Sequence, residues 1–467
     1  MTIINEDTIC AIATGRGGAI GIVRVSGPEA VSITDNIFTP ADKGGAPLAE
    51  RQPYTLAFGR ITDDNGETVD DVLVSLFRAP HSYTGEDATE ISCHGSAYIL
   101  QRVMQLLIAH GCRAAGPGEF TRRAFLNGKM DLSQAEAVAD LIASTSAATH
   151  RLAVNQMRGG FSRELAQLRD KLLRLTSLLE LELDFSDHEE LEFADRTELD
   201  TTAAQVETAI SRLASSFSVG NAIKNGVPVA IVGETNAGKS TLLNALVGEE
   251  RAIVSDIHGT TRDVIEDTTD IGGVTFRFID TAGIRDTDDT IERLGIDRTF
   301  KKISQADIVI WMLDATDTTA RSAQAAGKIL PLCQGKQLIV AHNKADIAPQ
   351  SSTPATPNLP QDARSISISA KQGTNIDRLR QMLVEAAGLP EISSADVVVT
   401  NVRHYEALAL ALDAIRRVRQ GLADGLPSDL VAQDLRDCLH RLAEIVGGEI
   451  TTEETLQNIF KHFCVGK

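Results

Sequence analysis

The chain has 467 residues, and 64 acidic against 45 basic side chains give it a formal net charge of -19 at pH 7. At roughly 100–200 residues per domain, this length predicts two to four domains, and an apolar fraction of 43% excludes a disordered protein. So acidic a chain is not a general nucleic-acid coat, because neutralising phosphates requires a basic surface, although local contact with RNA stays open.

The beginning of the chain, MTIINEDTIC, lacks a basic stretch followed by an apolar run, so we expect no secretory signal peptide. The longest apolar runs, such as Ile308–Leu313, are too short to span a bilayer, and we expect a cytoplasmic protein without membrane attachment. The cysteines are scattered without a CxxC pair, which argues against a disulfide scaffold and a cysteine zinc site. They are Cys10, Cys93, Cys112, Cys333, Cys438 and Cys464, and we expect reduced, mostly buried thiols.

Residues 1–125 mix short apolar runs with turn signals, as in Ile20–Val25 before Ser-Gly-Pro, which predicts a small α+β unit. Residues 126–222 have a helical pattern. One apolar stripe steps by four and three, as expected for a long amphipathic helix, through Phe161, Leu165, Leu168, Leu172, Leu175 and Leu179. The ten acids between Glu180 and Asp200 favour a solvated helix end or loop, with a metal site as the alternative.

Residues 223–390 contain apolar runs separated by helix-length segments, which is typical of a parallel sheet with crossover helices. The runs are PVAIVG, RFIDTAG, IVIWMLDA, QLIVAHNKAD and SISISA. Residues 391–467 are helical again, with a stripe at Leu435, Leu439, Leu442 and Val446 and a capping box from Thr451 to Glu454 that opens a last helix. The sequence therefore predicts a multidomain α/β and α+β protein in which an α/β unit is inserted into one helical domain.

The segment Gly233–Ser240 matches GxxxxGK[ST] between a strand at Pro228–Val232 and the helical sequence TLLNALVG. Glycines let such a P-loop wrap phosphates with backbone N–H groups, and the helix N-terminus adds a positive dipole end. We expect Lys239 at the β- and γ-phosphates and the hydroxyl of Ser240 on Mg²⁺. A glycine-rich turn without a ligand is the alternative, and the motifs further along the chain argue against it.

Three further motifs follow predicted strands. Asp280–Gly283 is suited to the metal's water shell and the γ-phosphate. In Asn343–Asp346 the final carboxylate can accept two hydrogens from a guanine edge, whereas adenine would leave polar groups unpaired. Ser369–Lys371 closes the base pocket. Four elements in this order predict GTP rather than ATP.

Together with GTTRD at Gly259–Asp263, these motifs resemble the five G-motifs of a translation-factor-type GTPase. The whole chain resembles the MnmE (TrmE) family of tRNA-modification GTPases, because stretches outside the G-motifs match as well. These are GRGG at Gly15–Gly18, TGED at Thr84–Asp87, PGEFTRRAFLNGKMDLSQAEA at Pro117–Ala137, and the terminal FCVGK. Val465 and Thr235 depart from the usual family pattern, and neither side chain has a chemical role.

The resemblance implies GTP-binding positions in the P-loop, both switches and the base loops. They are Asn236, Ala237, Gly238, Lys239, Ser240, Thr241, Ser255, Asp256, Ile257, His258, Gly259, Thr260, Thr261, Asp280, Thr281, Ala282, Gly283, Asn343, Lys344, Ala345, Asp346, Ser369, Ala370 and Lys371. It also implies potassium (K⁺) in place of an arginine finger, bound by Asn236, Ser255, Ile257 and Thr260. Thr261 joins Ser240 as a magnesium (Mg²⁺) ligand.

Ile284 directly follows Asp280–Gly283, at the position where many small GTPases carry a glutamine that orients the attacking water. An isoleucine cannot do this. The resemblance implies that Glu292 orients the attacking water through a bridging water, and that Lys239 is the other catalytic residue within residues 223–390. Arg285 is a further switch candidate. Taken without the resemblance, Glu292 would be a solvated helix acid.

For residues 1–125 the resemblance implies dimerisation and binding of a 5-formyl-tetrahydrofolate-like one-carbon donor by Arg24, Glu90, Lys129 and Lys467. Judged from the residues alone, surface ion pairs are the usual fate of such side chains. Cys464 is either a catalytic nucleophile or a buried residue that docks the tail, and reactivity would require a lowered pKa.

The predicted function is that of a homodimeric, K⁺-activated GTPase that works with the FAD-dependent partner MnmG (GidA). The resemblance implies that the pair modifies C5 of the wobble uridine of certain tRNAs, adding an aminomethyl or carboxymethylaminomethyl group. The flavin is expected on the partner, because no GxGxxG in a dinucleotide-binding context occurs here. Two alternatives are a ribosome-assembly GTPase switch without tRNA modification and a folate enzyme in which GTP is only regulatory.

Overall fold

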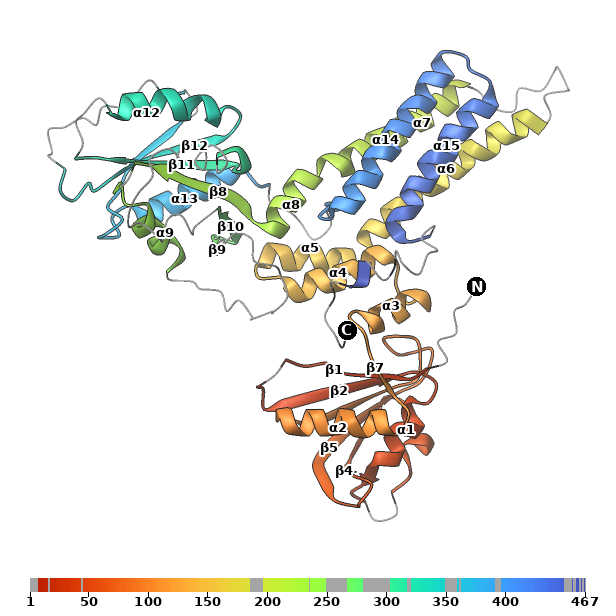
Figure 1. Cartoon of the computed structure of the whole chain (residues 1–467). Helices are drawn as coiled ribbons and strands as arrows, with labels where there is room; N and C mark the ends of the chain where they lie inside the picture. The colour runs from red at the N-terminus through yellow and green to blue at the C-terminus, as the bar shows by residue number, and fades with distance from the viewer. Residues whose placement is uncertain are drawn as a thin grey trace. The chain divides into compact units, whose positions relative to one another are not determined.

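The computed structural model describes residues 7–15, 17–42, 45–184, 196–234, 236–248, 267–279, 303–316, 321–348, 359–360, 363–390, 396–448, 456, 459–461, 463 and 466 (Figure 1). The chain forms two compact units. One comprises Met1–Ile142, Gln156–Ala203 and Asp413–Lys467, and the other comprises Ala143–Asn155 and Ala204–Leu412.

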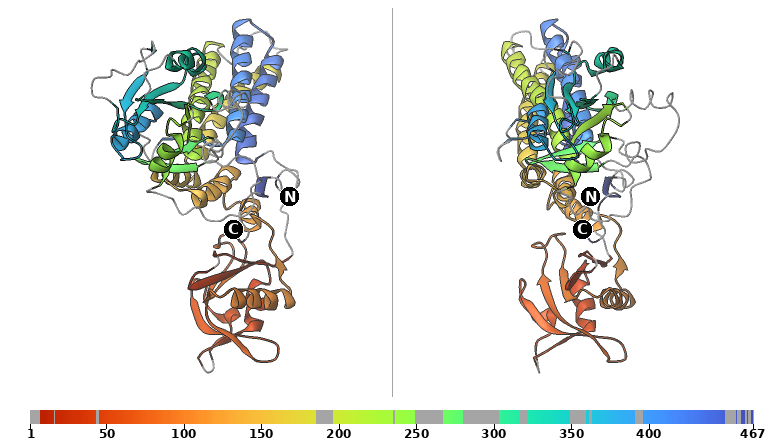
Figure 2. Two further views of the ribbon diagram at one scale, coloured as in Figure 1. Left: turned by 60° about the vertical axis from the view of Figure 1, so that its left-hand side comes forward. Right: turned by 90° about the vertical axis from the view of Figure 1, so that its left-hand side faces the viewer.

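The first unit begins with a seven-stranded sheet in the order β3-β4-β5-β6-β2-β1-β7. Its strands are β1 (Ile9–Ile12), β2 (Ile20–Ser26), β3 (Phe38–Pro40), β4 (Leu56–Thr62), β5 (Thr68–Phe77), β6 (Ala88–His94) and β7 (Arg113–Ala114). The helices α1 (Ala30–Ile37) and α2 (Ala97–Ala109) cover one face, as both views in Figure 2 show, and a short turn η1 (Leu48–Glu50) precedes β4. This sheet confirms the predicted α+β unit.

Alternation along β4 leaves one side of this strand without cover from the helices α1 and α2. Ala57 and Ile61 are buried beneath the helices, whereas Leu56 and Phe58 point to the other face and are 65% and 57% exposed. Phe58 lies opposite Leu73 of β5, which is also exposed. The second face therefore presents apolar side chains to solvent.

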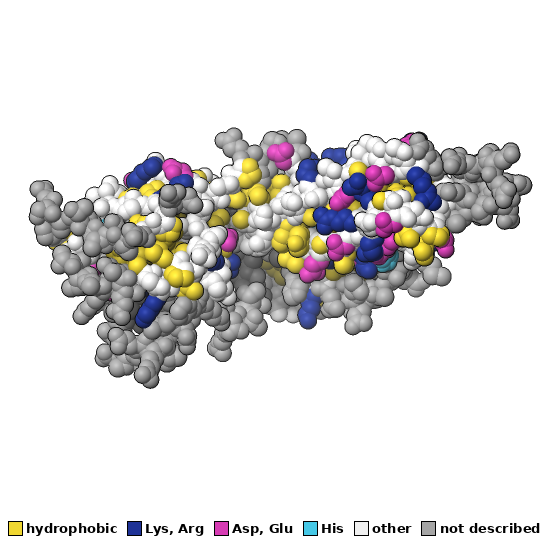
Figure 3. Space-filling model, turned by 90° about the horizontal axis from the view of Figure 1, so that it is seen from above, with side chains coloured by type: hydrophobic (Ala, Val, Ile, Leu, Met, Phe, Trp, Pro, Cys, Tyr) yellow, Lys and Arg dark blue, Asp and Glu magenta, His cyan; other side chains and the backbone are white. Residues whose placement is uncertain are grey.

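Along the chain, helices follow the first sheet and lie both before and after the strands of the second sheet. They are α3 (Glu119–Leu126), α4 (Leu132–Ala143), α5 (Ala147–Met157), α6 (Gly160–Asp184), α7 (Arg196–Ser215), α8 (Phe217–Asn225), α14 (Val402–Ala423) and α15 (Ser428–Val446). Every residue of the stripe predicted between Phe161 and Leu179 is buried in α6, which confirms that prediction. Basic and acidic side chains lie intermixed on the helical part, as Arg417 does with Asp434 and Asp437 (Figure 3).

The helix predicted from the spacing of Leu435, Leu439, Leu442 and Val446 is confirmed as α15, but that spacing does not mark its buried face. Leu435 and Leu442 are buried, but Leu439 and Val446 are only half-buried. The buried face is completed by Val431, Cys438 and Ile445. Because the helix carries more apolar positions than one stripe needs, periodicity alone left the angle of its buried face undecided.

The ends of the acidic segment belong to helices. Glu180 in α6 accepts from Arg436 at 2.6 Å, and Asp200 in α7 accepts from Arg419 at 2.9 Å. Residues 185–195 and the predicted capping box at Thr451–Glu454 lie outside the described residues. Within the described ranges, no group of three or more His, Cys, Asp or Glu side chains is placed to hold a metal ion.

The second unit contains a six-stranded sheet in the order β13-β12-β11-β8-β10-β9. Its strands are β8 (Val227–Gly233), β9 (Asp267–Ile271), β10 (Val274–Phe278), β11 (Ile308–Asp314), β12 (Gln337–Asn343) and β13 (Arg364–Ser367). All neighbours are parallel except β9 and β10. One face packs against α9 (Lys239–Val247) and α13 (Ile376–Ala387), and the other against α12 (Arg321–Ile329) and the turn η2 (Leu330–Cys333). The predicted parallel sheet with helices on both faces is confirmed.

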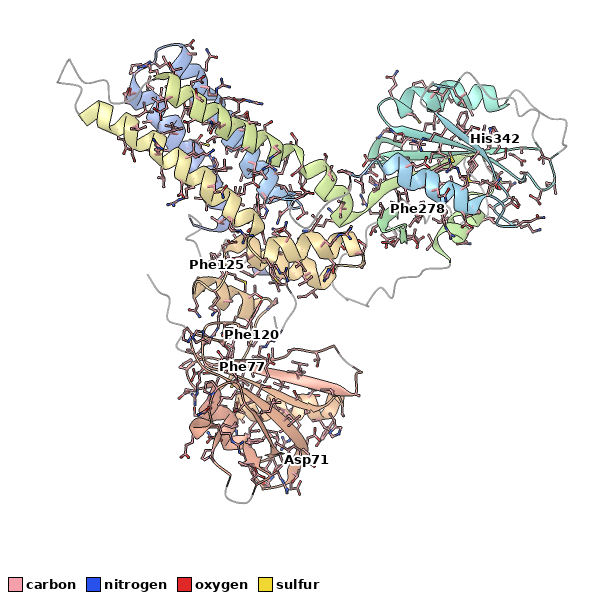
Figure 4. All side chains as sticks on the ribbon, turned by 180° about the vertical axis from the view of Figure 1, so that it is seen from behind. Asp71, Phe77, Phe120, Phe125, Phe278 and His342 are labelled. Carbon is pink, nitrogen blue, oxygen red and sulfur yellow. The ribbon has the colours of Figure 1, made fainter. Side chains whose placement is uncertain are left out.

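Strand β9 is an addition that the sequence did not predict. Its residues read Asp-Thr-Thr-Asp-Ile, of which only Thr269 and Ile271 are buried, so no apolar run marks it. It pairs antiparallel with β10 across the turn at Gly272 and Gly273, and both glycines have positive φ. The turn and the pairing, rather than apolar burial, make this edge strand. Phe278 at the end of β10 and His342 in β12 are labelled in Figure 4.

Two further expectations concern cysteines and membranes. Cys10, Cys93, Cys112, Cys333 and Cys438 are free and buried, which confirms the expectation for these five, and Cys464 lies outside the described residues. None of the helices in the described part combines the length and apolar character that crossing a bilayer requires.

Candidate functional site

The P-loop joins the end of β8 to the first turn of α9, and close packing demands glycine at two of its positions. A Cβ on Gly233 would lie 2.5 Å from the carbonyl oxygen of Met312, and one on Gly238 would overlap the side-chain nitrogen of Asn343. Asn236 has φ +65°, a left-handed conformation that non-glycine residues rarely adopt and that persists where the surroundings enforce it. The first N–H groups of α9 have no acceptors within the helix, so this end of the helix is suited to an anion.

Lys239 bends back over the loop. Its Nζ donates to the carbonyl oxygens of Gly233 at 3.0 Å and Glu234 at 2.7 Å. The ammonium is therefore held over the loop in which phosphates are predicted to lie. Ser240 and Thr241 follow in the first turn of α9.

Asn343 ties the P-loop to the base loop. Its side-chain nitrogen donates to Ala237 at 2.8 Å, and its side-chain oxygen accepts from the N–H of Ala370 at 2.9 Å. Because β8, β11 and β12 are parallel neighbours, their carboxyl ends bring these loops to one edge of the sheet. The structure thus brings together three of the motifs predicted for GTP.

The base loops leave one carboxylate accessible. Asp346 is exposed, with Gln372 at 3.4 Å as a weak donor to it. Ser369 is buried, its hydroxyl accepts from the N–H of Gln372 at 3.2 Å, and Lys371 is exposed. Ala345 donates to the carbonyl oxygen of Ile368 at 3.0 Å, which joins the two loops.

One residue at this edge was not singled out from the sequence. Asp314 ends β11, and its Oδ2 lies 2.5 Å from the Nζ of Lys344, while Oδ1 accepts from the N–H and hydroxyl of Thr316 at 2.9 and 2.6 Å. Burial alone would raise the pKa of Asp314, but the hydrogen bonds from Lys344 and Thr316 outweigh it and hold the pKa below its usual value. The sequence feature that could have identified Asp314 is its place as the acidic residue at the end of the apolar run IVIWMLD.

Part of the predicted site lies outside the described residues. It comprises Ser255, Asp256, Ile257, His258, Gly259, Thr260, Thr261, Asp280, Thr281, Ala282, Gly283, Glu292, Cys464 and Lys467. Of the residues predicted to bind K⁺ and Mg²⁺, the structure therefore describes only Asn236 and Ser240.

A second cluster lies in the first unit, around Arg24. Arg24 of β2 and Glu90 of β6 are cross-strand partners, and Nε of the arginine donates to the carboxylate at 2.9 Å. The guanidinium lies over the rings of Tyr83 and Phe120, 5.5 and 5.7 Å from their centroids. Phe120 comes from α3 and is labelled in Figure 4. The aromatic residues were not predicted individually, although each lies in or beside a stretch that carries the family resemblance.

The chain's tail reaches the same cluster. Arg24 donates to the carbonyl oxygen of Gly466 at 3.3 Å. Gly466 has φ +91°, and a Cβ there would overlap the carbonyl oxygen of Ile12. Lys129 is exposed and donates to Pro80 at 2.8 Å, on the loop that leads to Tyr83. Of the predicted folate residues, the structure brings Arg24 and Glu90 into contact and places the residue before Lys467 beside them.

Buried charges fix the loop that carries Tyr83. Arg123 of α3 is fully buried and binds Asp7 at 2.8 Å, Glu86 at 3.2 Å and Glu119 at 3.3 Å. Burial alone would raise the pKa of Glu119, but its hydrogen bonds from Arg113 and Gly116 hold that pKa below its usual value. A buried ion that makes several charged contacts is costly to disturb, so α3 and the Thr84–Asp87 loop hold each other in place.

Comparison with known families covers both units. The family of the GTP-binding protein TrmE N-terminus matches residues 8–129, and the family of the MnmE helical domain matches residues 132–464, more than half of the chain. The chain belongs to the MnmE (TrmE) family. The MnmE helical match runs across the second sheet, as an inserted α/β unit requires.

Individual relatives agree with this assignment. The tRNA modification GTPase MnmE of Phocaeicola vulgatus is 61% identical over 100% of both chains, and that of Bacteroides thetaiotaomicron is 64% identical over 99% of this chain and 100% of its own. Among solved structures, an Era variant of Aquifex aeolicus bound to GDP and aluminium fluoride is 28% identical over 40% of this chain and 66% of its own, with a TM-score of 0.26. A TM-score this low supports no further argument.

Proposed function

We propose that the chain hydrolyses GTP and acts in tRNA modification. The relatives from Phocaeicola and Bacteroides carry that name and align with this chain along its length. The observation that carries the GTP part is at the carboxyl edge of the second sheet, where Asn343 joins the P-loop to the Ser369–Lys371 loop and the carboxylate of Asp346 stays exposed. A carboxylate there accepts the two donors of a guanine edge.

Two cations belong to this proposal. Asn236 sits in an enforced left-handed turn with an amide oxygen, a hard ligand suited to K⁺, and Ser255, Ile257 and Thr260 would complete the site. Ser240 and Thr261 would hold Mg²⁺. The cations supply positive charge beside the phosphates. Lys239 adds its own charge there, and Glu292 is proposed to orient the attacking water.

The cluster around Arg24 is proposed to bind a 5-formyl-tetrahydrofolate-like one-carbon donor. Glu90 can accept hydrogens from a pterin edge, and Arg24 and the lysines Lys129 and Lys467 can pair with carboxylates of its tail. Tyr83 is 37% exposed beside Arg24, so its ring is accessible to a planar ligand. The contact between Arg24 and the tail residue Gly466 supports a place for the tail at this site, where Cys464 is proposed either as a nucleophile or as a residue that docks the tail.

The proposal includes a homodimer and a partner. The exposed face with Leu56, Phe58 and Leu73 supports dimerisation through residues 1–125, since such patches mark interaction sites. As the family resemblance implies, the partner is the FAD protein MnmG (GidA), the substrate is the wobble uridine of tRNA, and the location is the cytoplasm.

We also propose four segments as domains: residues 1–125, 126–222, 223–390 and 391–467. Gly226 and Gly388, with φ +80° and +57°, lie just before β8 and just after α13, near the ends of the third segment.

The experiment is nucleoside analysis of wobble uridines in a deletion strain that carries the wild-type chain, Lys239→Ala or Lys328→Ala. The matched control Lys328 is exposed on α12. Wild type and Lys328→Ala should restore the modified nucleoside, and Lys239→Ala should not, because it removes the ammonium held over the P-loop. Full modification by Lys239→Ala would exclude a role for GTP, and no restoration by wild type would exclude tRNA modification.

A further inference from the structure

Asp314 and Lys344 form an ion pair at the nucleotide edge that none of the predicted roles uses. Asp314 lies opposite Asn343 in the pairing of β11 with β12, so the lysine is the residue that follows this pair. The Nζ of Lys344 is 2.5 Å from Oδ2 of Asp314. The second carboxylate oxygen is occupied by Thr316, so the carboxylate is fixed by contacts on both oxygens.

The lysine is fixed at its backbone end as well. Its φ of +67° is left-handed, and its carbonyl oxygen accepts from Ile347 at 3.1 Å and Ala348 at 3.2 Å. With the ammonium held by Asp314, the four-carbon stem extends along the edge of the sheet from the end of β12 toward the end of β11. The lysine and aspartate side chains are 32% and 24% exposed, so the stem borders on the open side of the edge.

The position of this stem relative to the other motifs gives it a role. The preceding residue, Asn343, contacts the P-loop, and Asp346 follows two residues later with an exposed carboxylate. A purine whose edge meets Asp346 and whose phosphates meet the P-loop must pass this stem with one of its faces. A lysine stem offers an apolar surface while its ammonium stays in polar contact.

We propose that Asp314 is a positioning residue for the guanine nucleotide, which holds Lys344 extended so that its aliphatic stem forms one wall for the base. This inference rests on the proposed function of the site. A free lysine side chain has many rotamers, and holding it in the bound conformation removes an ordering cost from nucleotide binding. The wall contacts the face of any purine, whereas Asp346 reads the edge, so the pair governs affinity and leaves base selectivity to Asp346.

The experiment measures binding of fluorescent GDP and IDP to the full chain, and steady-state GTP hydrolysis. IDP lacks the 2-amino group that Asp346 is expected to bind. Asp314→Asn should weaken GDP and IDP by the same factor, about three- to ten-fold. The KM for GTP should rise while kcat stays within about two-fold, because the wall acts equally in the ground and transition states. The matched control is Asp377→Asn, which removes a carboxylate that is 92% exposed on α13, and it should change nothing.

A double-mutant cycle separates positioning from mere folding. Lys344→Met keeps a flexible stem and removes the ammonium, so it should weaken GDP and IDP as Asp314→Asn does. Adding Asp314→Asn to Lys344→Met should then cause no further loss of affinity.

The inference is overturned by unchanged GDP affinity in Asp314→Asn, by a loss of affinity that persists undiminished in the Lys344→Met background, or by an altered ratio of the affinities for GDP and IDP. If Asp314→Asn does not fold, Lys344→Met alone decides, since unchanged affinity there also overturns it. Failure of the wild-type chain to bind GDP would instead refute the proposed function.

Discussion

Asn343 shows how a motif residue can serve the site without facing the ligand. Both ends of its amide bind protein backbone, at Ala237 and Ala370. The amide is also so close to Gly238 that a side chain on that glycine would displace it. Asn343 is therefore a tie between the phosphate and base loops, and Asp346 is the accessible acceptor.

Asn236 gives the prediction for K⁺. If its amide oxygen binds the ion whose charge replaces an arginine finger, wild-type hydrolysis should be at least about ten-fold faster in KCl than in NaCl. Asn236→Ala should be slow in both salts. Phosphate release at equal ionic strength measures this, because screening then stays constant.

A matched control separates ion binding from backbone strain. Asn375 is also left-handed, with φ +59° against +65° for Asn236, and it donates to the carbonyl of Ser367. Asn375→Ala imposes a similar conformational cost and should keep the stimulation by KCl. Equal rates of the wild-type chain in both salts would remove K⁺ from the proposal.

The positions of single residues in the fold were predictable where they depend on spacing along the chain. Lys239 and Asp346 follow strands at fixed intervals, so the sequence located them. Asp314 lies 30 positions from Lys344, and the two meet only because β11 and β12 pair in one particular register. No local pattern contains that register.

Elements were predictable where apolar burial dominates. The stripe of α6 has one apolar face, and the sequence located it. The spacing in α15 indicated the helix but, because of extra apolar positions, not its buried face. The polar edge strand β9 was missed because pairing with β10 stabilises it. Cross-strand and tertiary contacts of this kind override local preference.

The two connections of the inserted unit are tied to each other. The helix α8 leads into β8, and the chain returns after α13 through the segment before α14. Ser216 accepts from the N–H of Val399 at 3.0 Å, and Phe217 stacks on Tyr405 with ring centroids 4.6 Å apart. Gly220 of α8 packs so closely on Val399 that a Cβ would overlap its carbonyl oxygen. This contact fixes α8 against the returning chain.

Gly220→Ala should therefore destabilise the protein. Alanine within a helix normally stabilises by about 0.5–1 kcal/mol relative to glycine, but overlap with a backbone carbonyl should reverse the sign and cost about 1–3 kcal/mol. Denaturant unfolding of the second unit measures the change. The control is Gly327→Ala in α12, where a Cβ meets nothing within 4 Å and alanine should stabilise. Shifts in the same direction for both variants would contradict this account.

The order of sheets and helices along the chain was predictable because the pattern of apolar residues differs from one kind of fold to the next. Short apolar runs give way to helical stripes, then to buried parallel strands, and then to helices again. The sequence did not reveal that the side of β4 and β5 opposite α1 and α2 is exposed. That face depends on which residues of β4 and β5 lie opposite each other, and Phe58 and Leu73 do.

This uncovered face yields the prediction for the assembly. Leu56, Phe58 and Leu73 are 65%, 57% and 43% exposed, on the side of the sheet opposite α1 and α2. Burying them against a second copy would remove apolar area from water, and a charge at the centre of such an interface would be left unpaired. Phe58→Lys should therefore convert a dimer into a monomer, as measured by light scattering after size-exclusion chromatography.

The control is Tyr98, which is 74% exposed on α2, away from this face, and Tyr98→Lys should leave the dimer intact. A stable interface buries roughly 1,200–2,000 Å², more than three side chains provide, so neighbouring positions on the same face must take part. A dimer that survives Phe58→Lys would move the interface elsewhere.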